Sequence, residues 1–241
     1  MPDTAVIVAA GLSSRLYPLT TDLPKALLPL GAETLLSRSI RLLKQNGISQ
    51  VAVVVGFQAD LMREAVGKDA TVVSNPFYRH CNNMGSLYFA REIAGDQPFV
   101  YLHGDLAYTG RMLAEFLRAT RSSNGSCLDL LTAYGEVDEE AMKVRVDESQ
   151  RLIESSKSVP LDEAAGEWTG IAVVHESRLV FEAIEQHMMK AGLNDYDTAA
   201  FTSLVAAGNT VRCIPSNGDA WKEIDTIDDL QAARAAFGGK A

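Results

Sequence analysis

Two hydroxyls and two basic side chains follow an apolar run near the start of the chain. Ser13, Ser14 and Arg15 come directly after the small residues at 9–11, and Lys25 lies ten residues beyond Arg15. Hydroxyls, main-chain N–H groups, a guanidinium and an ammonium are all suitable donors to phosphate oxygens. This set predicts a phosphate-binding loop. The alternative is a strand followed by a solvated turn, with Arg15 and Lys25 as ordinary surface charges.

Two aspartates are candidates for a metal site. Asp105 and Asp225 each come directly after a segment that reads as an apolar or aromatic strand. Magnesium prefers a few carboxylates and keeps other positions for phosphate and water, so two aspartates are sufficient. The alternative for each is a helix cap or a turn former, which is the commoner use of an aspartate at the end of a strand.

The phosphate-binding loop needs a strand that presents it. Residues 5–10 form an unbroken apolar run, which is typical of a strand buried on both faces of a parallel sheet. The small side chains that follow let a ligand approach the main chain, and Gly11 can adopt backbone angles closed to other residues. The loop contains neither GxGxxG nor GxxxxGK[ST], so it is not one of the two commonest nucleotide-binding signatures.

Strands and helices alternate after this loop. A helix is expected between Thr34, which would cap it, and Gly47, which would end it. Alternation of this kind predicts right-handed βαβ units and a doubly wound, mostly parallel α/β sheet. Ligands of such sheets bind at the carboxyl ends of the strands, which is where Asp105 falls. The further strands and helices are expected at 50–55, 59–66, 70–74, near 85–93 and at 98–102.

The second half of the chain has a different pattern. From Cys127 onward, short alternating segments are separated by acidic turns, as in antiparallel strands. This predicts a small mixed β insert or lid around 127–175. No repeat or low-complexity linker interrupts the chain, so residues 1–241 are expected to form a single domain. Later elements are expected as helices at 177–190, after Asp197 and from Thr226, with a strand at 210–215.

Composition and charge limit the class of protein. The 241 residues are 47% hydrophobic and 22% charged, which is ordinary for a soluble globular domain. No apolar run approaches the roughly 20 residues of a membrane span, and the N-terminus lacks the basic start of a secretory signal. We therefore expect a cytoplasmic protein without membrane contact. The net charge of −9 argues against nucleic acid as a partner, and the three cysteines lack the spacing of a zinc site.

The string AAGLSSRLYPLT, followed by PKALLPL, closely resembles the opening of the sugar-nucleotide and related nucleotidyltransferases. The resemblance implies a Rossmann-like fold of the nucleotide-diphospho-sugar transferase type. It also implies that Arg15 binds the β- and γ-phosphates, that Lys25 binds the α-phosphate or the attacking group, and that nearby main-chain groups hold the base and ribose. The expected nucleotide-binding residues are Ala9, Ala10, Gly11, Ser13, Arg15, Asn82, Ser86 and Gly104.

HGD at 103–105 resembles the metal-binding segment that this family has at the end of a strand, and WKEID at 221–225 resembles the second metal-binding segment of one branch, the cytidylyltransferases. Three further strings, NNMGSLYFA at 82–90, DEEAMKVRV at 138–146 and AGEWTGIA at 165–172, resemble the enzymes of that branch that use phosphocholine or 2-aminoethylphosphonate. The resemblance implies that Asp105 and Asp225 hold Mg²⁺, the expected cofactor. With Arg15 and Lys25 they would form the catalytic set. PKALLPL departs from the PKP common among sugar enzymes, which weakens a sugar 1-phosphate as the acceptor.

Acids, aromatic residues and lysines are candidates for binding the acceptor. A zwitterion such as 2-aminoethylphosphonate needs cations for its phosphonate and carboxylates or aromatic rings for its amine. Lys157 could bind the phosphonate of the acceptor, but it is equally well explained as a solvated surface charge. No histidine is assigned a role, because none has a plausible nucleophile partner in sequence. The candidates are Lys143, Glu167, Trp168, Tyr196, Asp197 and Trp221.

Together these features predict a magnesium-dependent cytidylyltransferase. It would transfer CMP from CTP to a small phosphonate or phosphate monoester, with 2-aminoethylphosphonate as the favoured acceptor. Phosphocholine and a sugar 1-phosphate are alternative acceptors, and a non-catalytic nucleotide-sensing protein is the alternative from another class. The expected partners are CTP and the acceptor, and a homodimer is also considered.

Overall fold

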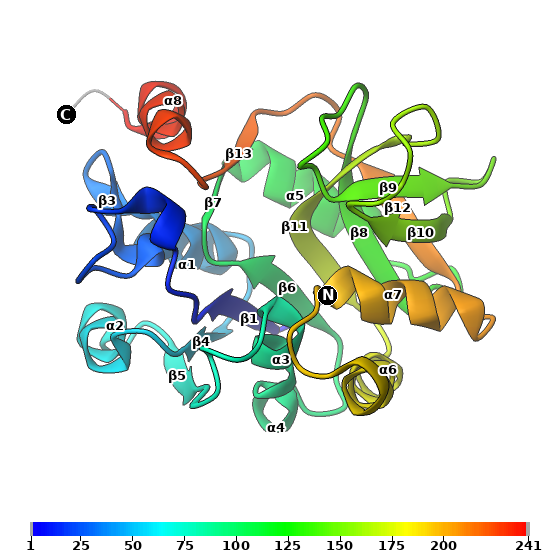
Figure 1. The fold of residues 1–241 in the computed structure, drawn as a ribbon, viewed down its shortest axis with the longest axis horizontal. Coiled ribbons are helices and arrows are strands. Elements are labelled where there is room, and N and C mark those ends of the chain that lie inside the picture. Colours follow the sequence, from blue (N-terminus) through cyan, green and yellow to red (C-terminus); the bar gives the residue numbers. More distant parts are fainter. Residues whose placement is uncertain (1, 240–241) are drawn as a thin grey trace.

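One nine-stranded sheet, covered by helices on both faces, organises the protein (Figure 1). The structure is a computed structural model that describes residues 2–239. The strand order is β10-β9-β11-β6-β1-β4-β5, and β8 pairs with β11 and with β12. Four neighbouring strands are parallel to one another: β6 (Phe99–His103), β1 (Thr4–Ala9), β4 (Gln50–Val55) and, at the edge of the sheet, β5 (Thr71–Ser74). The predicted doubly wound α/β sheet is confirmed.

β1 is central because its side chains are apolar on both faces of the sheet. Ile7 joins one cluster of buried side chains, whereas Val6 and Val8 join another on the opposite face. The first cluster includes residues of α1 (Leu35–Gln45), α2 (Ala59–Val66) and α5 (Gly110–Ala119). The second includes residues of α3 (Asn83–Tyr88), α4 (Arg91–Ala94), α6 (Ser177–Ala191) and α7 (Asp197–Ala206).

The ends of the helices follow local sequence signals. Thr34 caps α1: its hydroxyl accepts from the Ser37 N–H at 3.1 Å, and Ser37 Oγ accepts from the Thr34 N–H at 3.0 Å. The glycine expected to end this helix, Gly47, has a φ of +87°. The helix expected to begin near Gly85 begins at Asn83 instead, because Asn82 caps it.

The sheet continues with antiparallel strands beyond β6. β11 (Gly166–Val174) pairs with β6, and β8 (Leu128–Tyr134) lies between β11 and β12 (Val211–Pro215). The antiparallel strands expected at 127–175 are present, but β8 and β11 continue the main sheet because β11 pairs directly with β6. The hairpin of β9 (Lys143–Val146) and β10 (Leu152–Ser156) extends from the start of β11. A lid function of this hairpin stays a prediction.

A smaller ladder brings the end of the chain to the main sheet. β13 (Trp221–Glu223) pairs antiparallel with β7 (Leu106–Tyr108), and α8 (Ile227–Phe237) follows it. The Ile224 N–H donates to the Asp105 carbonyl at 3.0 Å, so the segment after β13 runs beside the segment after β6. A second short ladder joins β2 (Pro29–Leu30) to β3 (Glu33–Thr34).

Within residues 2–239, no helix combines the length and the apolar character that crossing a membrane requires. The structure describes a single chain, so the homodimer stays a prediction.

Candidate active site

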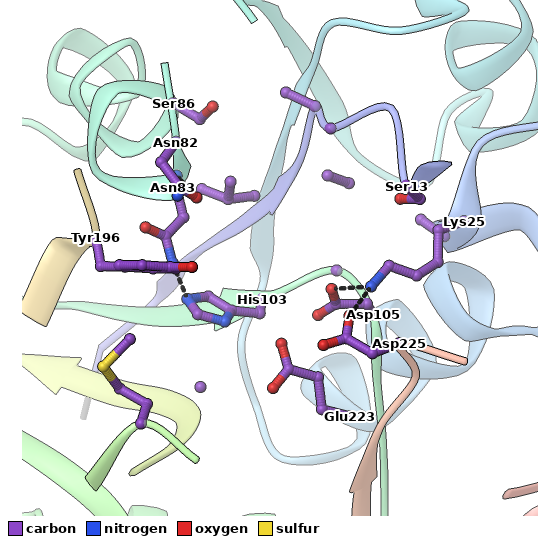
Figure 2. A pocket seen from close by; sticks show the side chains of 18 of the residues that line it. Ser13, Lys25, Asn82, Asn83, Ser86, His103, Asp105, Tyr196, Glu223 and Asp225 are labelled. Atoms are coloured by element: carbon purple, nitrogen blue, oxygen red, sulfur yellow. Dashed lines mark hydrogen bonds and ion pairs between the residues drawn. The ribbon is translucent and has the colours of Figure 1, made fainter. Parts of the chain in front are cut away.

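A cavity of about 340 Å³ lies at the carboxyl ends of β1 and β6 (Figure 2). Its volume falls within the range of small-molecule sites. Figure 2 shows Lys25 on one side of the cavity and Tyr196 on the other, with His103 between them and Asn82 and Ser86 above Tyr196 in this view. All eight predicted nucleotide-binding residues line it: Ala9, Ala10, Gly11, Ser13, Arg15, Asn82, Ser86 and Gly104. The structure therefore brings this set together, and the individual contacts to a nucleotide stay predictions.

Two glycines of the cavity have different local requirements. A Cβ on Gly104 would lie 2.7 Å from the Cβ of Ala9 and 2.9 Å from the carbonyl oxygen of Val8, so β1 and the segment after β6 approach each other too closely for a side chain. A Cβ on Gly11 would meet nothing within 4 Å. Gly104 is therefore required by packing, whereas the main chain at Gly11 is open to a ligand.

Lys25 joins the two aspartates that were predicted to bind a metal. Its Nζ lies 2.7 Å from Oδ2 of Asp105 and 2.9 Å from Oδ1 of Asp225 (Figure 2). Burial would lower the pKa of Lys25, but the two carboxylates outweigh burial and raise it. Burial would raise the pKa of Asp105, but the charges of Lys25 and His103 lower it. The ammonium and the Asp105 carboxylate are therefore both charged at neutral pH.

Arg15 reaches the same cluster from the predicted phosphate-binding loop. Its Nη1 lies 3.1 Å from Oδ2 of Asp225, and its side chain is 63% exposed. An ion pair with so much exposed surface is weak and exchanges readily. Arg15 is thus free to leave Asp225 for an anionic ligand in the cavity.

The carboxylates on this side of the cavity fit a divalent cation. One ligand atom each of Asp105, Glu223 and His103 lie within 4.8 Å of one another, and because a charged imidazole has no free lone pair for a metal, the two carboxylates are the candidate ligands of this group. Among the residues that the structure describes, the buried Oδ1 of Asp105 has no hydrogen-bond partner. The ammonium of Lys25 already shows that a cation is held between Asp105 and Asp225. Oxygen ligands of this kind suit magnesium, although the metal itself stays a prediction.

Glu223 was not singled out by the sequence analysis. Burial and the charge of Asp105 raise the pKa of its carboxyl to about 7. A cation held beside Glu223 would favour its charged form and offset that effect. The available signal was its position two residues before Asp225, because alternate residues of an extended chain point to the same side.

His103, to which no role was assigned, lies on the cavity wall beside the aspartate cluster. Its Nε2 lies 3.0 Å from Oδ2 of Asp197 and 3.1 Å from Nδ2 of Asn83. The same carboxylate oxygen of Asp197 accepts a hydrogen bond of 2.6 Å from the Tyr101 hydroxyl. Burial would lower the pKa of His103, but Asp197 raises it to about 9. Asp197 is therefore committed to this buried network.

The predicted acceptor-binding residues divide into two groups. Trp168 and Tyr196 line the cavity. The side chain of Asp197 has no exposed surface, and Trp221 packs against the core. Lys143 is also fully buried, and its ammonium donates to the carbonyls of Glu139 at 2.9 Å and Asp138 at 3.4 Å. The structure does not bring four of the six to the cavity walls: Lys143, Glu167, Asp197 and Trp221.

Other lining residues were not among the predicted site residues. Glu140 and Met142 come from the turn before β9, and Tyr78 and Asn83 flank the start of α3. Lys157, which was weighed as an acceptor ligand, also lines the cavity. Apart from the polar run at 75–83, the sequence offered no local signal for these residues, because their positions depend on how distant segments pack.

The sequence of this chain matches a known family over most of its length. Residues 5–195 match the MobA-like NTP transferase domain. The protein belongs to this family of nucleotidyltransferases.

Two curated relatives and one solved structure extend this result. The chain is 30% identical over 239 residues to a bifunctional IPC transferase and DIPP synthase of Aquifex aeolicus, covering 97% of this chain and 51% of that protein. It is 27% identical over 254 residues to a CMP-5'-(3-aminopropyl)phosphonate synthase of Streptomyces rubellomurinus, covering 98% and 39% respectively. The inositol-1-phosphate CTP transferase from T. maritima has the same fold, with a TM-score of 0.82, 21% identity and coverage of 98% and 96%.

The chain spans about half the length of the Aquifex aeolicus relative and 39% of the Streptomyces rubellomurinus relative.

Proposed function

We propose that the protein is a cytidylyltransferase, which transfers CMP from CTP to a small phosphonate or phosphate monoester. The observation that carries this proposal is the position of the Lys25 ammonium, between Asp105 and Asp225 and facing the cavity. The Lys25 ammonium and the two carboxylates, which could hold a metal ion, lie beside the loop at 9–15, which offers main-chain N–H groups and the Ser13 hydroxyl as hydrogen-bond donors. Such a site suits the transfer of a nucleotidyl group.

The proposed reaction is an in-line displacement. An oxygen of the acceptor attacks the α-phosphorus of CTP, the bond from that phosphorus to the pyrophosphate oxygen breaks, and the electron pair leaves with pyrophosphate. The second pKa of a phosphate monoester is about 6, so the attacking oxygen is already ionised at pH 7 and no general base is required. The protein's contribution is alignment and neutralisation of charge.

Each cationic group has a proposed role in this reaction. Lys25 binds the α-phosphate, where negative charge develops, and Arg15 leaves Asp225 to hold the departing pyrophosphate. Asp105, Asp225 and Glu223 would hold Mg²⁺, which supplies Lewis-acid neutralisation of phosphate charge when bound. Because Lys25 is held by two of these carboxylates, its ammonium is oriented before substrates bind.

Cytosine is the proposed base, read by main-chain groups near Ala10 and by Asn82 or Ser86. Both side chains line the cavity at the start of α3. Ser86 Oγ already accepts from Asn75 Nδ2 at 3.0 Å, which leaves its hydroxyl hydrogen for a ligand. A site built on such bonds rejects bases that leave them unpaired.

2-Aminoethylphosphonate is the proposed acceptor. The ring of Tyr196 lies on the side of the cavity away from Lys25, where an acceptor would extend (Figure 2), and Trp168 lines the cavity with its ring centre 4.8 Å from that of His103. The relative from Streptomyces rubellomurinus is named as the synthase of an aminoalkylphosphonate linked to CMP, which supports an acceptor of this class.

An acceptor panel tests the proposal. 2-Aminoethylphosphonate, phosphocholine, inositol phosphate and a sugar 1-phosphate would each be incubated with CTP, UTP, ATP and GTP, and released pyrophosphate measured. We expect release with CTP and the aminated phosphonate to exceed every other pair. Preference for another nucleotide would contradict the assignment of the base. Tight CTP binding with no release from any acceptor would favour a nucleotide-sensing protein.

A further inference from the structure

One end of the cavity already contains an ammonium group that belongs to the protein. Tyr196 lies at this end, away from Lys25 and the aspartates (Figure 2), and Lys157 and Glu140, which also line the cavity, lie beside it. We call it the acceptor end. Lys157 follows directly after β10, Glu140 lies in the turn before β9, and Tyr196 precedes α7, so distant segments build it.

The Lys157 ammonium has the two neighbours that a cation site requires. Its Nζ lies 3.2 Å from Oε2 of Glu140 and 5.7 Å from the centre of the Tyr196 ring. A carboxylate accepts the hydrogen bonds of an ammonium group, and the face of an aromatic ring attracts its charge. The chain thus shows, with its own side chain, that a primary ammonium fits between Glu140 and Tyr196.

The turn that carries Glu140 is held in place from two directions. The Asp138 carboxylate accepts from the N–H groups of Glu140 at 2.9 Å and Ala141 at 3.0 Å. The buried ammonium of Lys143 donates to the carbonyls of Asp138 and Glu139. A fully buried lysine is costly unless its donors are satisfied, so Lys143 fixes this turn rather than binding the acceptor itself. The backbone at Glu140 is therefore preorganised.

The ion pair between Lys157 and Glu140 is easily displaced. The side chains are 35% and 84% exposed, and ion pairs with this much exposed surface contribute little to stability. The two acids first considered for the acceptor's amine, Asp197 and Glu167, do not line the cavity. Among the described lining residues, Glu140 is the carboxylate at the acceptor end.

We propose that Glu140 and the ring of Tyr196 bind the primary ammonium of the acceptor, in the position that the Lys157 ammonium takes in this structure. This inference rests on the proposed function and makes Glu140 its specificity-determining residue. Lys157 is the resident competitor that the acceptor displaces. The acceptor class is then a small phosphonate or phosphate monoester with a primary amine at its far end.

Kinetics with two acceptors of nearly equal size test this inference. Propylphosphonate replaces the ammonium of 2-aminoethylphosphonate by a methyl group. Glu140→Gln should raise KM about fivefold for the aminated acceptor, because the charged partner of its ammonium is replaced by a neutral one, and should leave KM for propylphosphonate within about twofold. Lys157→Met should lower KM for the aminated acceptor or leave it unchanged. Glu139→Gln, the same change at the adjacent exposed acid, should alter neither.

Three results would overturn the inference while the proposed function stands. One is an equal change in KM for both acceptors in Glu140→Gln, and another is no change for either. The third is an increase in KM for the aminated acceptor in Lys157→Met, which would make Lys157 a ligand of the acceptor. If the native protein released no pyrophosphate with any acceptor, the proposed function would fail first, and this inference with it.

Discussion

The carboxylate of Asp197 and the imidazole of His103 lie 3.0 Å apart, with the aspartate fully buried and the histidine ring on the cavity wall. The negative charge of Asp197 favours the charged form of the ring and raises the pKa of His103 to about 9, against the effect of burial. Asp197 is therefore placed to act through His103 and not by direct contact with a ligand.

Replacing Asp197 by asparagine should lower the pKa of His103. Loss of the charge removes the attraction that offsets burial, and we expect a fall of at least about one unit, measured by NMR titration of the ring. Tyr101→Phe is the matched control, because it removes a hydrogen bond to the same carboxylate and keeps the charge. A pKa of His103 that stays near 9 in Asp197→Asn would refute this account.

Asp105→Ala should abolish most of the turnover without unfolding the protein. The variant loses one side of the proposed metal site and one partner of Lys25, and a loss of about 4 kcal/mol would lower the rate of pyrophosphate release roughly a thousandfold. Asp228→Ala, at an exposed acid in the first turn of α8, is the control. Near-native turnover in a folded Asp105→Ala variant would contradict the assignment, and an unfolded variant would indicate a structural role.

The two glycines of the cavity should respond differently to alanine. Gly104→Ala forces a Cβ against Ala9 and the main chain of Val8, so we expect a loss of about 2 kcal/mol and a Tm lower by roughly 4–8 °C. Gly11→Ala meets no protein atom and should keep its Tm, while the new methyl group raises KM for CTP. Thermal melting and initial rates measure the two effects. Equal melting temperatures for both variants would show that the close contact at Gly104 relaxes freely.

Asp129 should make folding sensitive to acid. This fully buried residue accepts from His175 Nε2 at 2.8 Å and from Arg212 Nε at 2.7 Å. Burial would raise the pKa of Asp129, but these partners lower it. A depressed pKa contributes stability above the unfolded value of about 3.9, which is lost as pH falls through the folded value.

Asp129→Asn should therefore cost about 3 kcal/mol at pH 7, where it leaves two donors without their charged partner. The difference from the native protein should shrink below about pH 4. Denaturant melts at pH 7 and pH 3 measure it. If the free energies of unfolding of the variant and the native protein differed by the same amount at pH 7 and pH 3, the proposed stabilisation by the Asp129 carboxylate would be contradicted.

Local patterns predicted the fold well where each element carries its own signal. The strand at 50–55 and the helix at 59–66 occur at the predicted positions, because an apolar run bounded by polar residues and an amphipathic period both depend on near neighbours. The residues predicted to bind phosphate are contiguous in sequence, and the structure places Ser13, Arg15 and Lys25 in the lining of the cavity; phosphate binding by them stays a prediction.

Packing between distant segments decided the rest of the site. Glu167 and Asp197 have the right chemistry for an amine, but the sequence cannot say that α7 and Tyr101 bury one of them. Nor could it say that the Lys143 ammonium turns inward to main-chain carbonyls. In the sequence, nothing distinguishes Glu140 from the other acidic residues of its turn. Its position beside Lys157, which in turn lies near Tyr196, follows only from the fold.

The ladder between β13 and β7 is separate from the nine-stranded sheet, yet it carries Glu223 and leads into Asp225, whereas Asp105 follows a strand of the sheet itself. A cation shared by these residues would bind only while β13 and the segment after it pack against the sheet, so cation binding would stabilise this packed arrangement. The site would thus help to hold the C-terminal segment against the rest of the protein. Amide hydrogens of β13 and α8 should then exchange with solvent more slowly at saturating magnesium.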